Sequence, residues 1–529
     1  MYDLVLSGGL VVDGSRAKPY AANVCVKDGR IARITEDEVS DAKKVLDVSG
    51  RIVSPGFIDI HTHSDASALV DYICDSKLAQ GVTTEIAGNC GSSAMPASPK
   101  NLEMVDEHLN ASSQLPLYGT RIAHLSITDY AERINASRPL TNFGSLIGHS
   151  NLRFAVMGFV DRDPTEEEME QLKALLDREL ERGAYGMSLG LIYPPSAFSK
   201  KEELIELSKV LKKHDALLCV HMRNEGPRVF EATDEMLEIA EKSGVHLQIS
   251  HIKLMGKPQW GRSDELIKKV EDAQARGINV TCDQYPFTAS STSLSAVLPN
   301  WAHEGGVSSM VERLSAPTAE LKEGMAAKIE ERGGAHTILI TTCKAGPRDY
   351  EGKYLSDIAE TLGIDPVDAA IRILLGARMA VKCVFFCMDE ADVLKFMPKM
   401  YICVGSDGVA FSYDPKWTPM NPHPRNFGTF PQFFQCVREH DLMPIEDAVY
   451  KVSGLPAQFL QLKDRGLLKE GYAADITVFD KDKIENLATY TNSKVRPNGI
   501  DYVIVNGEIA MDHNQLTDAR AGKALLYKK

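Results

Sequence analysis

The middle of the chain alternates short apolar runs with longer stretches in which apolar residues recur every three or four positions. Such alternation is typical of β-strands and amphipathic helices that follow one another around a parallel sheet. The clearest helix follows Thr165, which can form a capping box with Glu168, and it ends before Gly183. Its apolar residues share one face: Met169, Leu172, Leu176 and Leu180. Further helices are predicted at 201–213, 228–243 and 263–276.

Eight apolar runs in this region predict eight strands, the number that closes a (β/α)8 TIM-like barrel. The predicted strands are 52–63, 83–90, 145–149, 186–191, 217–221, 247–251, 279–285 and 401–407. The long interval before the eighth strand holds helical stretches and two more strand-like runs, at 337–342 and 381–387. We therefore expect an insertion near the barrel mouth, at about 286–345, where such segments often act as lids or specificity loops.

The two ends of the chain have a different pattern, made of short apolar runs separated by turns. Gly8-Gly9, Asp13-Gly14 and Asp28-Gly29 are hairpin signals near the start, and Asn506-Gly507 repeats the signal near the end. Neither end is large enough to bury a core alone. We therefore predict an α/β protein in which a small β-sandwich domain, residues 1–55 plus 470–529, brackets a barrel of residues 56–469.

Composition narrows the choice of partner and location. Of the 529 residues, 44% are hydrophobic and 25% are charged, which is ordinary for a soluble enzyme. The net charge of −14 argues against a nucleic-acid or anionic-membrane partner. No apolar run approaches the roughly 20 residues that a membrane span requires, and no signal peptide is seen. Most of the ten cysteines are interpreted as buried, reduced thiols, so we expect a cytoplasmic protein.

Residue types that bind metal ions stand at the ends of five predicted strands. They are His61, His63, Cys90, His221, His251 and Asp407. In a parallel barrel all carboxyl-terminal strand ends meet at one face, where such barrels keep their active sites. Each residue alone has a structural explanation, as a core histidine, a buried thiol or an Asx turn. Nothing structural requires them at so many strand ends, so the sequence predicts a metal site.

The donor types indicate which metal and which chemistry. Imidazole and thiolate favour zinc over magnesium or calcium. Bound zinc activates water near neutral pH and polarises a carbonyl oxygen. Asp407, at the last strand, is the natural candidate for the base that collects and delivers the proton. Metal-activated water beside a carboxylate predicts a hydrolase.

Five short motifs carry a resemblance to a known family. They are Gly81-Val82-Thr83-Thr84, Gly88-Asn89-Cys90-Gly91, Ser250-His251-Ile252-Lys253, Asp283-Gln284-Tyr285-Pro286 and His423-Pro424-Arg425-Asn426-Phe427-Gly428-Thr429-Phe430. With them, the chain resembles the amidohydrolase superfamily over nearly its whole length, and within it the D-aminoacylase (N-acyl-D-amino-acid deacylase) family. Cys90 is the discriminating feature, because hydantoinase and dihydroorotase relatives place a carboxylated lysine as the bridging group. No lysine ends a strand at an equivalent place here.

The resemblance implies a role for each candidate residue. One tightly bound zinc ion would be held by Cys90, His221 and His251. A second, weaker site that shares Cys90 would be formed by His61 and His63. The catalytic base of a hydrolase that cleaves N-acyl-D-amino acids would be Asp407. The α-carboxylate of the substrate would be bound by Lys253, Tyr285 and Arg425, and a guanidinium can bind it with two parallel hydrogen bonds.

The absence of a cation from one segment predicts the type of side chain that the substrate carries. Relatives specialised for an acidic side chain are expected to place a cation in the pocket-lining segment 286–312, which contains no lysine or arginine. We therefore expect a neutral, even apolar, side chain, with Leu294, Leu298 and Trp301 as candidate lining. These three residues are about as well explained as core of the insertion.

Two alternatives to a deacylase stay open. One is another amidohydrolase, which would act on a cyclic amide, a carbamate or an N-acyl dipeptide-like compound. The other is a non-catalytic binding or assembly protein that keeps the barrel. Such proteins typically lose metal ligands, whereas every predicted ligand is present here together with Asp407.

Overall fold

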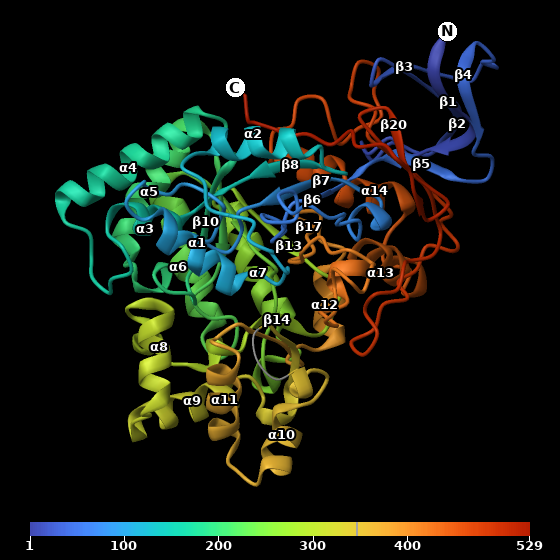
Figure 1. Cartoon of the computed structure of the whole chain (residues 1–529). Helices are drawn as coiled ribbons and strands as arrows, with labels where there is room; N and C mark the ends of the chain where they lie inside the picture. Colours follow the sequence, from blue (N-terminus) through green and yellow to red (C-terminus); the bar gives the residue numbers. More distant parts are fainter. Residues whose placement is uncertain (345–347, 529) are drawn as a thin grey trace.

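A parallel barrel lies at the centre of the molecule in the computed structural model, which describes residues 1–344 and 348–528 (Figure 1). The barrel strands are β6 (Phe57–Asp59), β7 (Val82–Ala87), β8 (Asn142–Ser145), β9 (Ile147–Gly148), β10 (Gly186–Gly190), β11 (Leu217–His221), β12 (His246–Ile249), β13 (Val280–Gln284) and β17 (Ile402–Val404). They form two parallel sheets, β6-β7-β8 and β9-β10-β11-β12-β13-β17. β8 and β9 are successive pieces of one strand, interrupted only at Leu146.

The ring closes between the first and last strands. Beyond β17, the Asp407 amide donates to the His61 carbonyl at 2.8 Å, and the His63 amide donates to the Gly408 carbonyl at the same distance. Thr62 and Gly408 form a parallel bridge at this seam. Eight strand positions therefore enclose one barrel, as predicted. The predicted strand 52–63 is two strands, because its first part, β5 (Ile52–Pro55), belongs to a different sheet.

Helices cover the outside of the barrel. Those predicted from periodicity are α4 (Glu166–Glu181), α5 (Lys201–His214), α6 (Val229–Ser243) and α7 (Ser263–Ala275). Thr165 and Glu168 form the predicted capping box of α4. The other covering helices are α1 (Leu102–Ser112), α2 (Ile127–Ser137), α3 (His149–Val156), α12 (Glu390–Phe396), α13 (Arg425–Glu439), α14 (Ile445–Val452) and α15 (Gly454–Phe459). None of the helices in the described ranges has the length and apolar character to cross a bilayer.

Between β13 and β17 the chain builds a separate layer below the barrel in Figure 1. Its antiparallel sheet has the order β14-β16-β15. The strands are β14 (Ser290–Ser293), β15 (Ile338–Cys343) and β16 (Val381–Phe385), and the helices are α8 (Gly306–Ser315), α9 (Ala319–Glu331), α10 (Leu355–Leu362) and α11 (Pro366–Gly376). They share their own apolar core. This insertion extends past residue 345 to Phe385, because β16 is the central strand of its sheet.

Both ends of the chain join in one nine-stranded sheet, of order β21-β20-β19-β18-β5-β1-β2-β3 with β4 beside β1. The strands are β1 (Tyr2–Val11), β2 (Tyr20–Lys27), β3 (Arg30–Thr35), β4 (Ala42–Asp47), β5, β18 (Ile476–Phe479), β19 (Ile500–Val505), β20 (Glu508–Asp512) and β21 (Gln515–Leu516). β5 and β18 pair antiparallel where the two ends meet. The division into domains at 1–55, 56–469 and 470–529 stays a prediction.

Candidate metal centre

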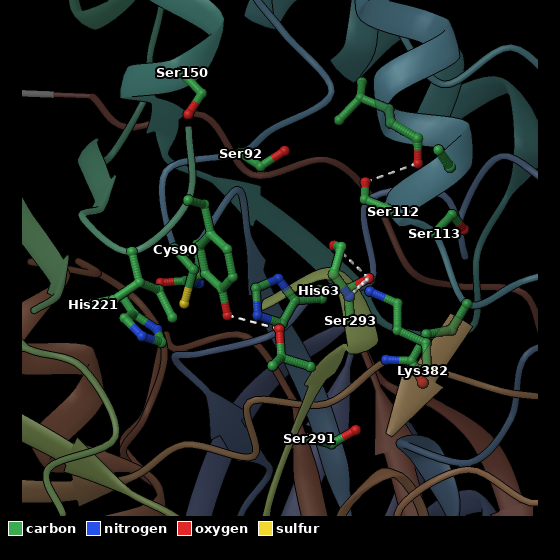
Figure 2. Close-up of a pocket in the computed structure, with 18 of the residues that line it drawn as sticks. His63, Cys90, Ser92, Ser112, Ser113, Ser150, His221, Ser291, Ser293 and Lys382 are labelled. Carbon is green, nitrogen blue, oxygen red and sulfur yellow. Dashed lines mark hydrogen bonds between the residues drawn. The ribbon is translucent and has the colours of Figure 1, made fainter. Parts of the chain in front are cut away.

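All six predicted metal-site residues gather at the carboxyl-terminal end of the barrel. Potential ligand atoms of His61, Cys90, His251 and Asp407 lie within 4.8 Å of one another. A second group, His221 with Glu225 and His251, meets the same limit. Figure 2 shows His63, Cys90 and His221 around one pocket. The strands therefore converge on one centre, as their shared direction requires.

His61 and His251 are oriented in the same way. Their Nε2 atoms lie 3.3 Å and 3.5 Å from the Cys90 Sγ. The opposite ring nitrogens contact carboxylates: His61 Nδ1 lies 3.0 Å from Asp283, and His251 Nδ1 lies 2.9 Å from Glu225. A carboxylate on the far nitrogen is the usual device that orients a metal-binding histidine.

His221 supplies the observation that tests whether a metal fits. Both of its ring nitrogens are buried, and neither makes a hydrogen bond within residues 1–344 and 348–528, although Glu225 Oε2 lies 3.5 Å from Nε2. Leaving a buried polar atom unpaired costs roughly 1–3 kcal/mol. A metal ion between Cys90, His221 and His251 would satisfy one of these nitrogens, so the residues fit a bound ion.

The Cys90 thiol is poised as a ligand. Burial alone would raise its pKa, yet the adjacent His61 and His251 imidazoles hold the pKa of Cys90 well below its usual value. The thiolate is the form of cysteine that binds metal. Its charge and its position between the two imidazoles agree with a shared ligand.

The backbone of the site is strained at three residues. Cys90, His251 and Asp407 have φ values of 51°, 38° and 50°, in the left-handed region that non-glycine residues seldom adopt. Each such residue costs about 1–3 kcal/mol and is typically found where function requires it. Gly190 is needed beside Cys90, because a Cβ at this position would lie 2.0 Å from the Cys90 carbonyl oxygen.

Asp407 lies between the metal cluster and a cation. Its Oδ1 is 2.9 Å from His63 Nε2, and its Oδ2 accepts from Arg425 Nη1 at 2.7 Å. Burial would raise the pKa of Asp407, but Arg425 and then His251 hold that pKa well below its usual value. The carboxylate is therefore ionised at neutral pH and can accept a proton.

The three predicted substrate-binding residues are stacked together. The Lys253 ammonium and the Arg425 guanidinium both lie over the Tyr285 ring, 5.6 Å and 5.1 Å from its centroid. Lys253 Nζ donates to Glu225 at 2.6 Å. The Tyr285 hydroxyl is buried without a partner in the described part of the chain. All three line a cavity of about 260 Å³, whose wall also includes His63, Cys90, His221 and Asp407.

Comparison with known proteins agrees with this geometry. A model of the amidohydrolase family matches residues 44–338 and 406–511. The chain belongs to the amidohydrolase family.

Relatives of this amidohydrolase match it from end to end. It is 33% identical to the D-aminoacylase of Alcaligenes xylosoxydans xylosoxydans, over 99% of its own length and 97% of the relative's. It is 33% identical to the N-acyl-D-glutamate deacylase of that organism, over 96% and 93%. The crystal structure of the Bordetella bronchiseptica N-acyl-D-glutamate deacylase, complexed with zinc and a phosphonate mimic of the tetrahedral intermediate, matches at TM-score 0.83 and 33% identity over 99% of both chains.

One prediction about this amidohydrolase is wrong. Leu294, Leu298 and Trp301 do not line the cavity. Leu294 and Leu298 are buried in the apolar core of the insertion, and Trp301 is 40% exposed. The insertion instead presents the hydroxyl-bearing strand β14 and, from β16, Lys382 to the cavity.

Four residues that support the site were missed from the sequence. Glu225 and Asp283 hold the histidines as described above. Behind Asp407, the Lys77 ammonium contacts the Ser406 hydroxyl and donates to Asp59 at 2.8 Å, and Asp59 accepts the Ser406 amide at 2.9 Å. Asp283 begins one of the motifs at a strand end, and Glu225 follows His221 by four positions, so both carried a signal. Nothing in the sequence connects Lys77 with Asp59.

Proposed function

We propose that this amidohydrolase is a zinc-dependent N-acyl-D-amino-acid deacylase, which hydrolyses the amide bond to a carboxylate and a free D-amino acid. One observation carries the proposal: three members of the His/Cys cluster border the same cavity as Asp407 and the Lys253–Tyr285–Arg425 group, namely His63, Cys90 and His221. The similarity to D-aminoacylase over 99% of the chain supports the same reaction. The Lys253 and Arg425 cations favour a substrate that carries a carboxylate, which a cyclic amide or carbamate without one would not match.

The tightly bound zinc is assigned to Cys90, His221 and His251. The unpaired His221 nitrogens and the lowered pKa of the Cys90 thiol support this set. His61 and His63 would form the weaker second site, with Cys90 shared between the two. When bound, zinc supplies Lewis acidity that activates water and polarises the scissile carbonyl.

Asp407 is assigned as the general base and then the general acid. It accepts the proton of the attacking water as the new C–O bond forms, and it returns a proton to the leaving nitrogen as the C–N bond breaks. Arg425 keeps the carboxylate ionised for the first step. His63, on Oδ1, fixes its orientation.

The α-carboxylate of the substrate is assigned to Lys253, Tyr285 and Arg425. Arg425 Nη1 and Nη2 already donate to Asp407 and to the Ser291 carbonyl, but a guanidinium has five N–H groups. Burial first of all raises the pKa of Tyr285 well above its usual value, so its hydroxyl remains a donor. The unpaired hydroxyl would gain its partner from the substrate.

The cavity and the cysteines support a small-molecule substrate and a location in the cytoplasm. A cavity of about 260 Å³ suits a small molecule. All ten cysteines are free thiols, and burial covers nine of them, which supports a reducing compartment such as the cytoplasm.

The activity test uses purified protein and D/L pairs of N-acetyl-methionine, -leucine, -glutamate and -glutamine. We expect about one firmly held zinc ion per chain by mass spectrometry and acetate release from the D-enantiomers. If zinc is present and neither enantiomer of any substrate is hydrolysed, the deacylase proposal is wrong. Hydrolysis of a hydantoin or of an N-alkoxycarbonyl amino acid alone would select the cyclic-amide or carbamate alternative.

The ligand set is tested by Cys90→Ala, with Cys25→Ala as the matched control. Both thiols are buried, but Cys25 lies in β2 of the end sheet. We expect the Cys90 variant to lose its zinc and the Cys25 variant to keep it, measured on folded protein after gel filtration. Equal zinc content in the two variants would contradict the assignment.

A further inference from the structure

The Lys382 ammonium enters the cavity without a protein partner. Lys382 is the second residue of β16 and is part of the cavity wall. In the described ranges, no hydrogen bond or ion pair reaches its Nζ. Figure 2 shows the side chain extending toward Ser293 at the pocket. Lys382 is half-buried, and a partly buried charge without a partner is costly, so it is seldom kept without a use.

The other cations of the cavity wall are already engaged. Lys253 pairs with Glu225, and Arg425 pairs with Asp407. Arg332 stacks on the Phe385 ring at 4.7 Å, and Phe385 points away from the face of β16 that carries Lys382. Arg332 has no carboxylate partner in the described wall either, and its Nε is buried without a hydrogen bond, but its guanidinium lies over the Phe385 ring. Lys382 is thus the wall cation that has neither a carboxylate nor an aromatic partner in the described chain.

The charge of Lys382 persists at neutral pH. Burial is the main cause that lowers the pKa of Lys382 to about 8; Lys344 and Arg425 act in the same direction, while Cys383 and Asp407 oppose them. His108 and His303 also line the cavity, but burial lowers the pKa of each to about 4, so both are neutral. The carboxylates of the wall, Asp65, Glu225 and Asp407, all come from the barrel.

Hydroxyl groups surround Lys382. In the β14–β16 register Ser293 lies opposite Lys382 and Ser291 lies opposite Val384, so both serines share the face of Lys382. Ser112 and Ser113, at the end of α1, also line the cavity, as Figure 2 shows. Ser293 and Ser112 already donate their hydroxyl protons to the Val381 and Leu109 carbonyls. The hydroxyl protons of Ser291 and Ser113 are not used by any bond in the described chain, so these two can donate to an anion that the ammonium attracts.

Lys382 and its neighbouring serines lie beside the proposed α-carboxylate site but do not overlap with it. Arg425 Nη2 donates to the Ser291 carbonyl at 3.1 Å, and Lys382 pairs two residues farther along β14. A ligand whose carboxylate meets Arg425 would therefore direct a neighbouring branch toward Lys382.

We propose that Lys382 binds a second anionic group of the substrate, so that this deacylase prefers N-acyl-D-amino acids with an acidic side chain, such as D-glutamate or D-aspartate. The inference rests on the proposed deacylase activity. A carboxylate at the far end of the acyl group would offer the same chemistry, and the substrate panel distinguishes the two sources. This assignment replaces the neutral side chain expected from the segment 286–312.

The experiment measures kcat/KM for isosteric pairs. N-acetyl-D-glutamate is compared with N-acetyl-D-glutamine, and N-succinyl-D-leucine with its amide isostere N-succinamoyl-D-leucine. We expect the wild-type protein to prefer the acidic member of the first pair, and Lys382→Met to reduce that ratio by about tenfold or more, chiefly through KM. Lys382→Arg, which keeps the charge, should retain most of the preference.

Lys344→Met is the matched control. Lys344 has a similarly lowered pKa of about 8, but its ammonium donates to Asn110 and it is not part of the cavity wall. We expect the ratio of kcat/KM for N-acetyl-D-glutamate to that for N-acetyl-D-glutamine to be the same in this variant as in the wild-type protein. If the wild-type protein prefers the acidic member only in the succinyl pair, the second anion lies on the acyl group. A loss of that preference in Lys382→Met would still support an anion site at Lys382.

Failure of the inference is distinct from failure of the deacylase proposal. If wild-type protein hydrolyses N-acyl-D-amino acids and Lys382→Met leaves both ratios unchanged, Lys382 does not bind an anion of the substrate. If no N-acyl-D-amino acid is hydrolysed, the deacylase proposal itself is wrong. Zinc content and the thermal midpoint of each variant show that the comparison is made on folded, metal-loaded protein.

Discussion

The charged groups on the barrel side of the cavity have partners within the protein, whereas Lys382 on the insertion side has none in the described chain. On the barrel side Asp407, Glu225 and Asp283 each contact a cation or an imidazole of the same protein. On the insertion side Lys382 stands among serines and has no partner in the described chain. Groups whose charges are matched within the protein are held in place before a ligand arrives. An unmatched group is one whose partner is expected to arrive with the ligand.

This contrast assigns different tasks to the two sides. The barrel side holds the groups that perform the reaction, and these come from strand ends that the barrel fixes rigidly. The insertion side holds no residue that we assign to the chemical step, so its residues can differ between enzymes and determine which substrate is accepted. Substitutions on the two sides should therefore differ in kind, the first acting on turnover and the second on the choice between substrates.

The largest effect is expected from Asp407→Asn on the barrel side. The amide preserves shape but cannot accept the proton of the attacking water, so kcat should fall by about 10²–10⁴. Steady-state kinetics with N-acetyl-D-glutamate and zinc analysis on the same sample measure this. A variant that keeps its zinc and near-normal turnover would show that Asp407 is not the base.

A smaller effect is expected from Tyr285→Phe. Loss of the unpaired hydroxyl removes one hydrogen bond to the substrate carboxylate, and KM should rise about tenfold while kcat changes less. Tyr413→Phe is the control, because the Tyr413 hydroxyl is also buried and unpaired in the described chain but lies outside the cavity wall. The same KM change in both variants would mean that the Tyr285 hydroxyl has no direct role in binding.

The smallest effect is expected from Ser291→Ala on the insertion side. The Ser291 side chain is half-buried, and its loss removes a neutral hydroxyl from the face that carries Lys382. We expect kcat/KM for acidic substrates to fall by about two- to threefold, because a half-buried hydroxyl should lie near the low end of the roughly 0.5–1.5 kcal/mol that a neutral hydrogen bond contributes. A loss as large as that of Lys382→Met would move the anion site from the ammonium to the serine.

The sequence predicted the barrel side well for a physical reason. Strand ends of a parallel barrel converge, so His61, Cys90, His221, His251 and Asp407 could be brought together from the order of apolar runs alone. The capping box of α4 and the joining of the two chain ends were visible in the same way. Supporting contacts such as Lys77–Asp59 were not, because they depend on side-chain packing between elements.

The insertion side could not be predicted from one segment. The search for a cation covered 286–312, whereas Lys382 comes from a strand that pairs with β14 across 88 residues of chain. Which residue of β16 faces Ser293 depends on strand register, and a shift by one residue would turn Lys382 into the core. Register of this kind is set by tertiary packing, which made the apolar lining an incorrect prediction.

The shared sheet of the two chain ends has a consequence for synthesis of the protein. Ser54 of β5 meets Thr477 of β18, 423 positions later. At a translation rate of roughly 5–20 residues per second, β18 is synthesised about 20–85 s after β5. During that time one edge of β5 is open to pairing with other chains. Nascent protein should therefore depend on chaperones more than its finished, stable sheet would suggest, and ribosome-bound fragments that end before β18 should aggregate more readily than the released chain.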